Sequence, residues 1–355
     1  MSALARVGQA VVVGGAIGAG FAGKARLRQR NEIDLHDRVV LITGASRGLG
    51  LVMAREFAAE GAKLAICART EGDLERAKED LEADGTEVLA VRCDVADRTQ
   101  VRNLIRQVTD HYGRIDVLVN NAGVISAGPL ESQNIQDFEM AMDIMYWGVV
   151  YPTLEVLPQM RERKAGRIVN ITSVGGKVSV PHLLAYNGAK FAATGFSEGL
   201  TAEVAKDGIK VTTVIPGVMR TGGHVNAFFK GKHETEYALF SVMSSLPFFS
   251  IPAEQAAREV IAAVKAGKAE ITPAAHARIL ARMNGLMPGT MTTIFGLANR
   301  LLPGTKPGGQ QRKRGKESES AVSQSFLAEP AREAAEKNLE FDRENLADHA
   351  SVEPA

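Results

Sequence analysis

The sequence of 355 residues is poor in the features that mark several common protein classes. It holds 42 basic and 41 acidic residues, so a net charge of +1 gives no general basis for nucleic-acid binding. Its two cysteines, Cys67 and Cys93, fall within or at the ends of predicted strands, which favours small buried side chains over a disulfide-stapled secreted fold. Seven histidines are scattered without metal-ligand spacing, so we predict no metal site.

The chain has enough apolar residues, 45%, to bury a full core, and it shows no internal repeat. Apolar runs alternate with amphipathic stretches long enough for helices, which predicts βαβ units and a parallel sheet in one α/β domain. Several runs are almost wholly apolar, as in strands that are covered on both faces. The predicted strands lie at 38–43, 63–68, 87–92, 115–119, 166–172 and 209–215.

Tyr186 and Lys190 lie four residues apart in the segment AYNGAK, and Ser173 precedes the tyrosine by thirteen residues. A tyrosine with its ordinary pKa near 10 is a poor acid or base at neutral pH. If 185–205 forms a helix, the two side chains share one face, and the Lys190 ammonium can lower the pKa of Tyr186. Ser173 adds a hydroxyl that can hold a substrate oxygen. The pattern predicts proton-transfer chemistry, although Y-x-x-x-K alone is common by chance.

A glycine-rich turn, TGASRGLG from Thr43 to Gly50, follows the apolar run 39–42 and precedes a helix-like stretch from Leu51 to Ala59. Strand, glycine turn and helix in this order are typical of dinucleotide binding. The glycines allow the backbone to approach a pyrophosphate, which sits at the positive end of the helix. Taken alone, the turn could also be an ordinary loop between strand and helix.

Three further elements follow in order. The sequence NNAG at 120–123 ends the predicted strand 115–119; Ser173, Tyr186 and Lys190 come next; and Pro216-Gly217 with Thr221 follows the strand at 211–215. With the glycine turn, these elements over residues 36–272 resemble the short-chain dehydrogenase/reductase family. The spacing G-x-x-x-G-x-G favours its smaller dehydrogenase branch over the epimerase-like branch, which usually carries G-x-x-G-x-x-G.

The resemblance implies a Rossmann-like, doubly wound parallel sheet over residues 36–275, a nicotinamide cofactor, and Ser173, Tyr186 and Lys190 as catalytic residues. It also identifies candidate cofactor contacts along the whole domain. The positions that we assign to cofactor binding are Gly44, Ser46, Arg47, Gly48, Leu49, Gly50, Arg69, Asp94, Val95, Asn120, Ala122, Gly123, Tyr186, Lys190, Pro216, Gly217 and Thr221.

No acid follows the second predicted strand, which runs into Ala68-Arg69-Thr70. A carboxylate there would bind the ribose diol of NAD and repel the 2′-phosphate of NADP. Arg69 and Arg47 could instead reach that phosphate, whose geometry suits guanidinium groups. We therefore expect NADP(H) in preference to NAD(H); the alternative is that both arginines are solvated surface charges. Asp94 matches the family residue that contacts the adenine amino group, or it could cap the following helix.

Met145 stands where the family usually has an asparagine. Aligned on Gly148, the stretch DIMYWG at 143–148 replaces an N-x-x-G pattern. In the family this asparagine helps to hold a water molecule that joins the lysine to solvent, partly through its backbone carbonyl; methionine keeps the carbonyl and loses the amide. We favour an active enzyme with a modified proton relay, because Ser173, Tyr186 and Lys190 are retained. The alternative is a catalytically weak, membrane-attached NADPH-binding scaffold or sensor.

Residues 1–35 form an apolar and basic extension. Positions 7–23 are uncharged, and Lys24, Arg26, Arg28 and Arg30 follow them. A helix of this length falls just short of a hydrocarbon core about 30 Å thick, and six glycines weaken it. The basic cluster predicts a place on the cytoplasmic face of a membrane or in the cytoplasm. The extension is therefore a possible membrane anchor. A signal peptide, a mitochondrial presequence and disorder are the alternatives.

Residues 276–302 contain a second uncharged run, 283–299, which could lie at a membrane surface, cover the substrate cleft, form a subunit contact or pack on the core. For 303–355, composition predicts a linker and charged tail, largely disordered, with a short charged helix near 331–347. We also expect a homo-oligomer.

The segment between Thr221 and Pro252 corresponds to the one that closes over substrate in the family. Its apolar side chains are Phe228, Phe229, Leu239, Phe240, Leu246, Phe248 and Phe249. An apolar lid suggests a small apolar or lipid-like carbonyl or alcohol, although the same residues could pack the lid onto the core or a neighbouring subunit. We expect hydride transfer between NADP(H) and such a substrate, coupled to proton transfer through Tyr186.

Overall fold

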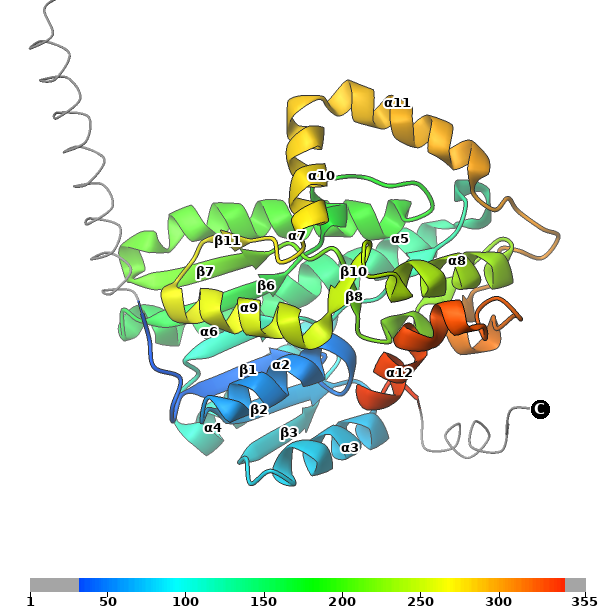
Figure 1. The fold of residues 1–355 in the computed structure, drawn as a ribbon. Helices are drawn as coiled ribbons and strands as arrows, with labels where there is room; N and C mark the ends of the chain where they lie inside the picture. The colour runs from blue at the N-terminus through cyan, green and yellow to red at the C-terminus, as the bar shows by residue number, and fades with distance from the viewer. Residues whose placement is uncertain (1–31, 342–355) are drawn as a thin grey trace, which may run out of the picture.

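A seven-stranded parallel sheet forms the centre of the protein (Figure 1). The computed structural model describes residues 32–341. In sheet order the strands are β11 (Glu270–Ile271), β7 (Ile209–Val214), β6 (Gly166–Ile171), β4 (Val117–Asn120), β1 (Val39–Thr43), β2 (Lys63–Ala68) and β3 (Val88–Arg92). The six predicted strands are all present, and the Rossmann-like fold is confirmed.

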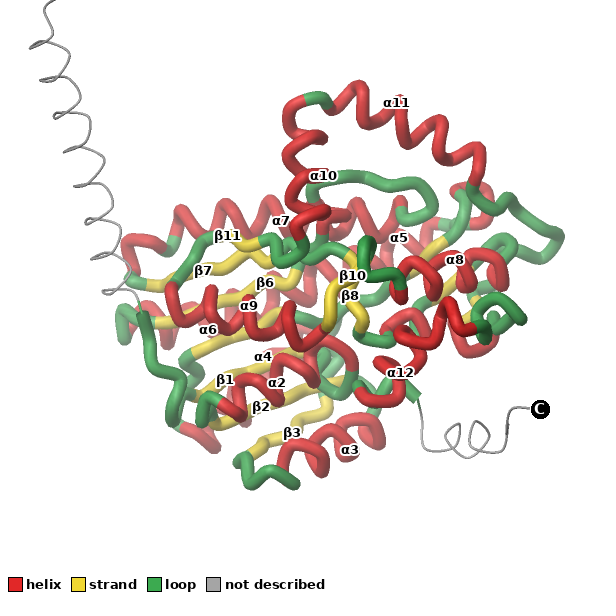
Figure 2. The backbone as a smooth tube through the Cα atoms, in the orientation of Figure 1, coloured by secondary structure: helices red, strands yellow, loops and turns green. Residues whose placement is uncertain are grey.

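Helices cover both faces of the sheet, which explains the nearly continuous apolar strands (Figure 2). Along β1, Val40 and Ile42 pack into one core and Val39 and Leu41 into another, as the side-chain period of two requires. On the first face lie α2 (Gly48–Ala59), α3 (Glu71–Glu82) and α9 (Ala253–Ala266); on the second lie α4 (Arg98–Tyr112), α6 (Gly148–Glu162) and α7 (Leu184–Glu203).

The strand order reverses between β1 and β4, so the loops after these two strands border a crevice at the carboxyl edge of the sheet. The loops after β6 and β7 leave the same edge, because all the strands are parallel. All the predicted site motifs therefore lie at the carboxyl edge of the sheet. The edge strand β11 was not predicted, because two residues are too few to give a recognisable pattern.

The lid segment after Thr221 contains short strands and one helix. These are β9 (Phe228–Phe229), α8 (His233–Ser245) and β10 (Ser250–Pro252), and β10 pairs with β8 (Val218–Arg220), which directly precedes the lid. Phe229 is fully buried, with its ring 5.5 Å from Tyr237 and 6.1 Å from Phe240, and this aromatic cluster of the lid packs against Ile125, Ala127 and Leu183. Phe248, in contrast, is 77% exposed. The predicted apolar lid thus divides into a packed part and an open part.

Residues 303–341 differ from the predicted disorder. They form β12 (Lys313–Arg314), which pairs with β9, and α12 (Glu329–Lys337), which packs on α8. Arg312 donates a 2.8 Å hydrogen bond to Asp137, a buried carboxylate that also pairs with Lys230. Composition alone gave the wrong prediction because it does not reveal partners far away in the sequence.

The uncharged run 283–299 falls on two helices, α10 (Ala275–Leu286) and α11 (Pro288–Ala298), which project from the sheet as an arch (Figure 1). Met291 is the one buried residue of α11, so packing on the core does not explain this run. Within residues 32–341, no helix is long and apolar enough to cross a membrane. The run 7–23 and the basic cluster behind it lie outside the described residues, as do residues 342–355.

Candidate active site

The glycine turn links β1 to α2 in a conformation that depends on its glycines. Gly44 and Gly48 have φ values of +62° and +57°, in the left-handed region that favours glycine. At Gly50 a Cβ atom would meet the carbonyl oxygen of Gly44 and, at 2.6 Å, the amide of Asn121. Side chains at these positions would push the turn away from the helix N-terminus, where an anion is favoured.

Hydrogen bonds fasten this turn to the end of β4. The Thr43 hydroxyl oxygen accepts from the backbone N–H groups of Asn121 and Ala122, at 3.0 and 3.1 Å. The Asn121 side chain donates back to the carbonyl oxygens of Thr43 and Gly44, at 3.0 and 2.9 Å. The predicted NNAG motif therefore fixes the glycine turn in place through Asn121, a residue that we did not predict as a site residue.

Ser173, Tyr186 and Lys190 come together at the carboxyl edge of the sheet. Ser173 follows β6, while Tyr186 and Lys190 lie one turn apart on α7. A Cβ atom on Gly175 would lie 3.0 Å from the Tyr186 ring and 3.3 Å from the Ser173 hydroxyl, which places these two groups beside each other. The Lys190 ammonium lies 5.8 Å from the centroid of the Tyr186 ring.

Burial changes the acid–base properties of this group. It lowers the pKa of Lys190 to about 8, because the ammonium lies in the protein interior. Burial also raises the pKa of Tyr186, and a hydrogen bond with Ser173 opposes that rise. In this structure Tyr186 is therefore a protonated phenol at neutral pH, which is the form that can donate a proton.

Met145 and Lys190 both lie next to Gly123. A Cβ atom on Gly123 would be 3.9 Å both from the Met145 side chain and from the Lys190 ammonium. Met145 belongs to a π-helical turn, Asp143–Trp147, between α5 (Ile135–Met142) and α6. Such turns interrupt the regular helical bonding and are frequent at functional sites.

Of the other predicted positions, Asn120 holds neighbouring elements together and Asp94 lies at the surface of the sheet edge. Asn120 is buried and donates to Asn170 at 2.8 Å and to Thr153 at 3.0 Å, so its amide joins β4 to β6 and α6. Asp97, not Asp94, caps the N-terminus of α4, so the capping alternative for Asp94 is wrong. Asp94 lies partly exposed after β3.

Several other predicted residues lie at the carboxyl edge of the sheet: Pro216, Gly217 and Thr221 after β7, and Val95 after β3. Ser46 and Leu49 are buried in the glycine turn. The Pro216 carbonyl oxygen accepts from the N–H of Val174 at 2.8 Å, which ties the end of β7 to the segment after Ser173. Val95 packs against Gly148.

Arg69 directly follows β2 and its side chain is exposed, but a carboxylate lies nearby in space. Asp73 on α3 is buried and accepts from Arg47 at 2.8 Å and from Arg76 at 2.6 Å. We did not predict Asp73 or Arg76, although their i, i+3 spacing on a helix could have indicated the pair. Arg47 also lies 3.7 Å from the Glu340 carboxyl group, so two arginines and two acidic side chains meet at this corner of the site.

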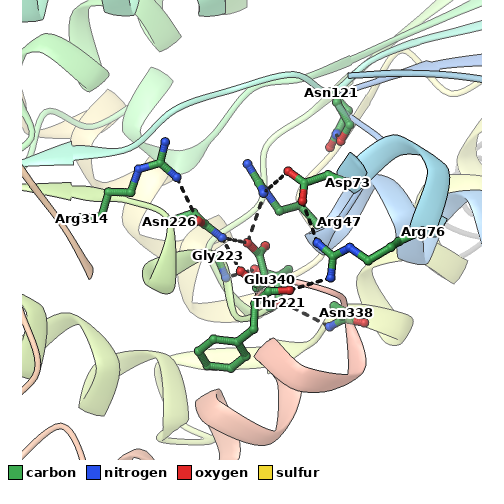
Figure 3. Close-up of polar contacts among 12 residues, drawn as sticks. Arg47, Asp73, Arg76, Asn121, Thr221, Gly223, Asn226, Arg314, Asn338 and Glu340 are labelled. Carbon is green, nitrogen blue, oxygen red and sulfur yellow. Dashed lines mark hydrogen bonds and ion pairs between the residues drawn. The ribbon is translucent and has the colours of Figure 1, made fainter. Parts of the chain in front are cut away.

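The C-terminal segment also reaches the glycine turn (Figure 3). The N–H of Gly48 donates to the carbonyl oxygen of Asn338 at 2.9 Å. Glu340 is buried, with a carboxylate oxygen 2.5 Å from where a Cβ atom of Gly48 would lie. The close approach that glycine permits at this position is used here by the Glu340 carboxyl group. The glycine turn therefore fits an anionic group such as a cofactor phosphate.

The short-chain dehydrogenase family model matches residues 38–229 of this chain. The chain is 41% identical over 204 residues to a dehydrogenase/reductase SDR family protein 7-like of Anopheles gambiae, covering 56% of this chain and 64% of that protein. It is 33% identical over 275 residues to 11-beta-hydroxysteroid dehydrogenase A of Sesamum indicum, covering 76% and 78%. The chain spans 64% and 63% of the lengths of two such relatives, the Anopheles protein and mouse dehydrogenase/reductase SDR family member 7B.

Solved structures agree. A short-chain dehydrogenase from Streptomyces avermitilis is 29% identical with a TM-score of 0.62, covering 74% of this chain and 98% of that one. A variant of actinorhodin polyketide ketoreductase solved with NADPH is 30% identical with a TM-score of 0.59, covering 66% and 95%. The chain belongs to the short-chain dehydrogenase/reductase family, whose members are oxidoreductases that act on alcohol and carbonyl groups.

Proposed function

We propose that this protein transfers hydride between NADP(H) and a small apolar or lipid-like substrate, reducing a carbonyl or oxidising the corresponding alcohol. The observation that carries the proposal is the meeting of Ser173, Tyr186 and Lys190 at the sheet edge beside the glycine turn. The relative named as an 11-beta-hydroxysteroid dehydrogenase supports an apolar substrate class.

The preference for NADP(H) is supported by the charges near the glycine turn. Arg47 and Arg76 lie on either side of Asp73, and Arg69 is exposed at the end of β2. Guanidinium groups bind phosphate in a bidentate manner, whereas the Asp73 carboxylate opposes it. Three arginines against two acids, Asp73 and Glu340, favour a 2′-phosphate.

In the proposed mechanism the cofactor supplies the hydride, and the chain supplies alignment and the proton. The Ser173 hydroxyl holds the substrate oxygen, and Tyr186 donates its proton to that oxygen as the carbonyl becomes an alcohol. Because burial keeps Tyr186 protonated, its state suits reduction. The Lys190 ammonium then stabilises the phenolate that remains.

A purified full-length chain should oxidise NADPH in the presence of apolar aldehydes or ketones, followed by the loss of NADPH absorbance. Steroid, retinoid and acyl carbonyls form a suitable panel, with NADH assayed in parallel. Faster turnover with NADPH supports the proposal. Tight NADPH binding without turnover on any substrate would instead support the scaffold alternative, which Met145 beside Lys190 favours.

We further propose that the arch of α10 and α11 rests on a membrane surface. Leu286, at the end of α10, is 81% exposed, and Leu301, in the short turn after α11, is 89% exposed; Ile279, Ile294 and Leu297 on the two helices are 60%, 48% and 56% exposed. Apolar side chains gathered on projecting helices are typical of surface attachment. A lipid-like substrate could reach the lid from that surface.

A further inference from the structure

The end of the described chain lies across the glycine turn, between α2 and the lid (Figure 3). Residues 338–341 follow α12 and contact both the glycine turn and the start of the lid at Thr221. Asn338 accepts from the N–H of Gly48 and donates at 3.3 Å to the carbonyl oxygen of Thr221. Gly48 and Thr221 both belong to the predicted cofactor-binding set, so the segment bridges two parts of that site.

Glu340 occupies the centre of this arrangement. Its carboxylate fills the space beside Gly48, accepts from the Asn226 amide at 2.8 Å, and lies 3.7 Å from the Arg47 guanidinium. The space beside this glycine, at a helix N-terminus and next to an arginine, has the features by which proteins hold phosphate. The Glu340 carboxyl group thus occupies the space beside Gly48 that a cofactor phosphate would take.

The neighbouring residues hold this segment in place. The Phe341 carbonyl oxygen accepts from Arg76 at 2.6 Å, and the Phe341 side chain packs with Val225 and Ala335. Ala335 is fully buried against Gly222, which has φ +83° and leaves no space for a Cβ atom. Arg47 and Arg76, two of the arginines that we propose near a 2′-phosphate, are therefore engaged by the tail and by Asp73.

We infer that residues 338–341 are an internal competitor of the cofactor: they occupy the phosphate part of the nucleotide site, and NADP(H) must displace them to bind. This inference rests on the proposed function, because it takes the glycine turn to be the NADP(H) site. A displaceable tail lowers the apparent cofactor affinity by the fraction of time that the site is free.

The test compares two full-length variants on α12. Ala335→Glu places a charged side chain in the buried contact with Gly222 and should release the tail, whereas Ala334→Glu makes the same change at a neighbouring, partly exposed position. NADPH binding is measured by titration of nicotinamide fluorescence. If the tail covers the site about nine-tenths of the time, release should tighten NADPH binding about 10-fold. An added negative charge could only weaken binding, so a gain cannot come from the charge itself.

Equal NADPH affinity in the two variants, or weaker affinity in Ala335→Glu, would overturn the inference and leave the proposed function standing. Failure of NADPH and NADH to bind any form, with circular dichroism showing folded protein, would instead contradict the proposed function. Hydrogen exchange on the unaltered chain gives an independent answer. NADPH should speed exchange in residues 329–341; slower exchange would mean that the tail closes over the cofactor and does not compete with it.

Discussion

The Lys190 ammonium, 5.8 Å from the centroid of the Tyr186 ring, donates a 2.8 Å hydrogen bond to the carbonyl oxygen of Ile171. Ile171 is the last residue of β6, and Ser173 follows it after one residue. The end of one strand thus positions both the lysine and the serine, while α7 supplies the tyrosine. This arrangement makes the spacing of Tyr186 and Lys190 useful, because the buried ammonium is held near the phenol and has no acidic partner within residues 32–341.

Cofactor discrimination should depend on Arg69. Arg69→Asp removes a phosphate partner and adds a repelling charge, so NADPH should bind more weakly by roughly 10–150-fold, the equivalent of one charge-assisted contact of about 1.5–3 kcal/mol. NADH should change little. Arg106→Asp, at an exposed position on α4, is the matched control. Titration of both cofactors checks this, and an unchanged NADPH-to-NADH ratio would remove Arg69 from the site.

Met145 should limit proton transfer. Met145→Asn supplies an amide beside Lys190 that can hold a water molecule, so turnover should rise by about 10-fold with little change in NADPH affinity. Steady-state rates with one carbonyl substrate measure the effect. A lower turnover in a folded variant would show that the surrounding pocket is adapted to methionine.

The tail should respond to pH through Glu340. Burial raises the pKa of Glu340 from 4.5 to about 7; the Arg47 charge and the Asn226 amide oppose the shift, and Asp73 adds to it. Arg76, through the Phe341 carbonyl, and Arg314, through Asn226, are the other charged groups nearby. The docked tail keeps a proton that a released tail loses above pH 4.5. Raising the pH from about 4.5 to 7 should therefore weaken docking and tighten NADPH binding.

Glu340→Gln fixes the neutral form and isolates this effect. The variant and the unaltered chain should differ least in NADPH affinity at pH 5, whereas at pH 8 the unaltered chain should bind at least about 10-fold more tightly, since one pKa unit is tenfold. The ratio of the two affinities is taken at each pH, because protonation of the cofactor's own phosphate affects both forms equally and drops out of that ratio. A ratio that is constant from pH 5 to 8 would show that Glu340 does not control docking.

Membrane attachment should depend on the α10–α11 arch. Leu286→Glu with Leu301→Glu replaces two side chains that are 81% and 89% exposed. Each buried leucine contributes about 1.5–3 kcal/mol, so vesicle binding should fall at least roughly 100-fold for the pair. Phe326→Glu, 82% exposed elsewhere, is the control. Sedimentation with phospholipid vesicles measures binding, and equal sedimentation of all forms would contradict the proposal.

The fold could be predicted from the sequence because its signals are local. The strands repeat apolar residues over four to six positions, and the glycine turn joins the first strand to a helix, so β1, β2 and α2 were found near their observed bounds. The spacing of Tyr186 and Lys190 likewise placed both residues on one face of α7. These patterns depend on neighbours in the chain and not on tertiary contacts.

The parts that sequence missed depend on distant partners. Glu340 lies 292 positions after Gly48 (340 − 48), and nothing in the local sequence links them. The Gly-, Lys- and Arg-rich composition after Pro303 predicted disorder, yet Arg312 is held by Asp137 and Ala335 by Gly222. Asp73 was missed because the acid that binds the ribose diol of NAD is expected directly after the second strand, whereas this carboxylate comes from the next helix, α3.

Turnover by Tyr186→Phe, compared with the unaltered chain on the best carbonyl substrate with NADPH, tests the proposed chemistry most directly. The substitution keeps the ring that packs beside Ser173 and removes the hydroxyl that donates the proton. General acid catalysis is worth about 10²–10⁴-fold, so turnover should fall by that factor while fluorescence titration shows NADPH binding little changed. Turnover that stays within about twofold of the unaltered chain would contradict a catalytic Tyr186 and, with it, the proposed mechanism.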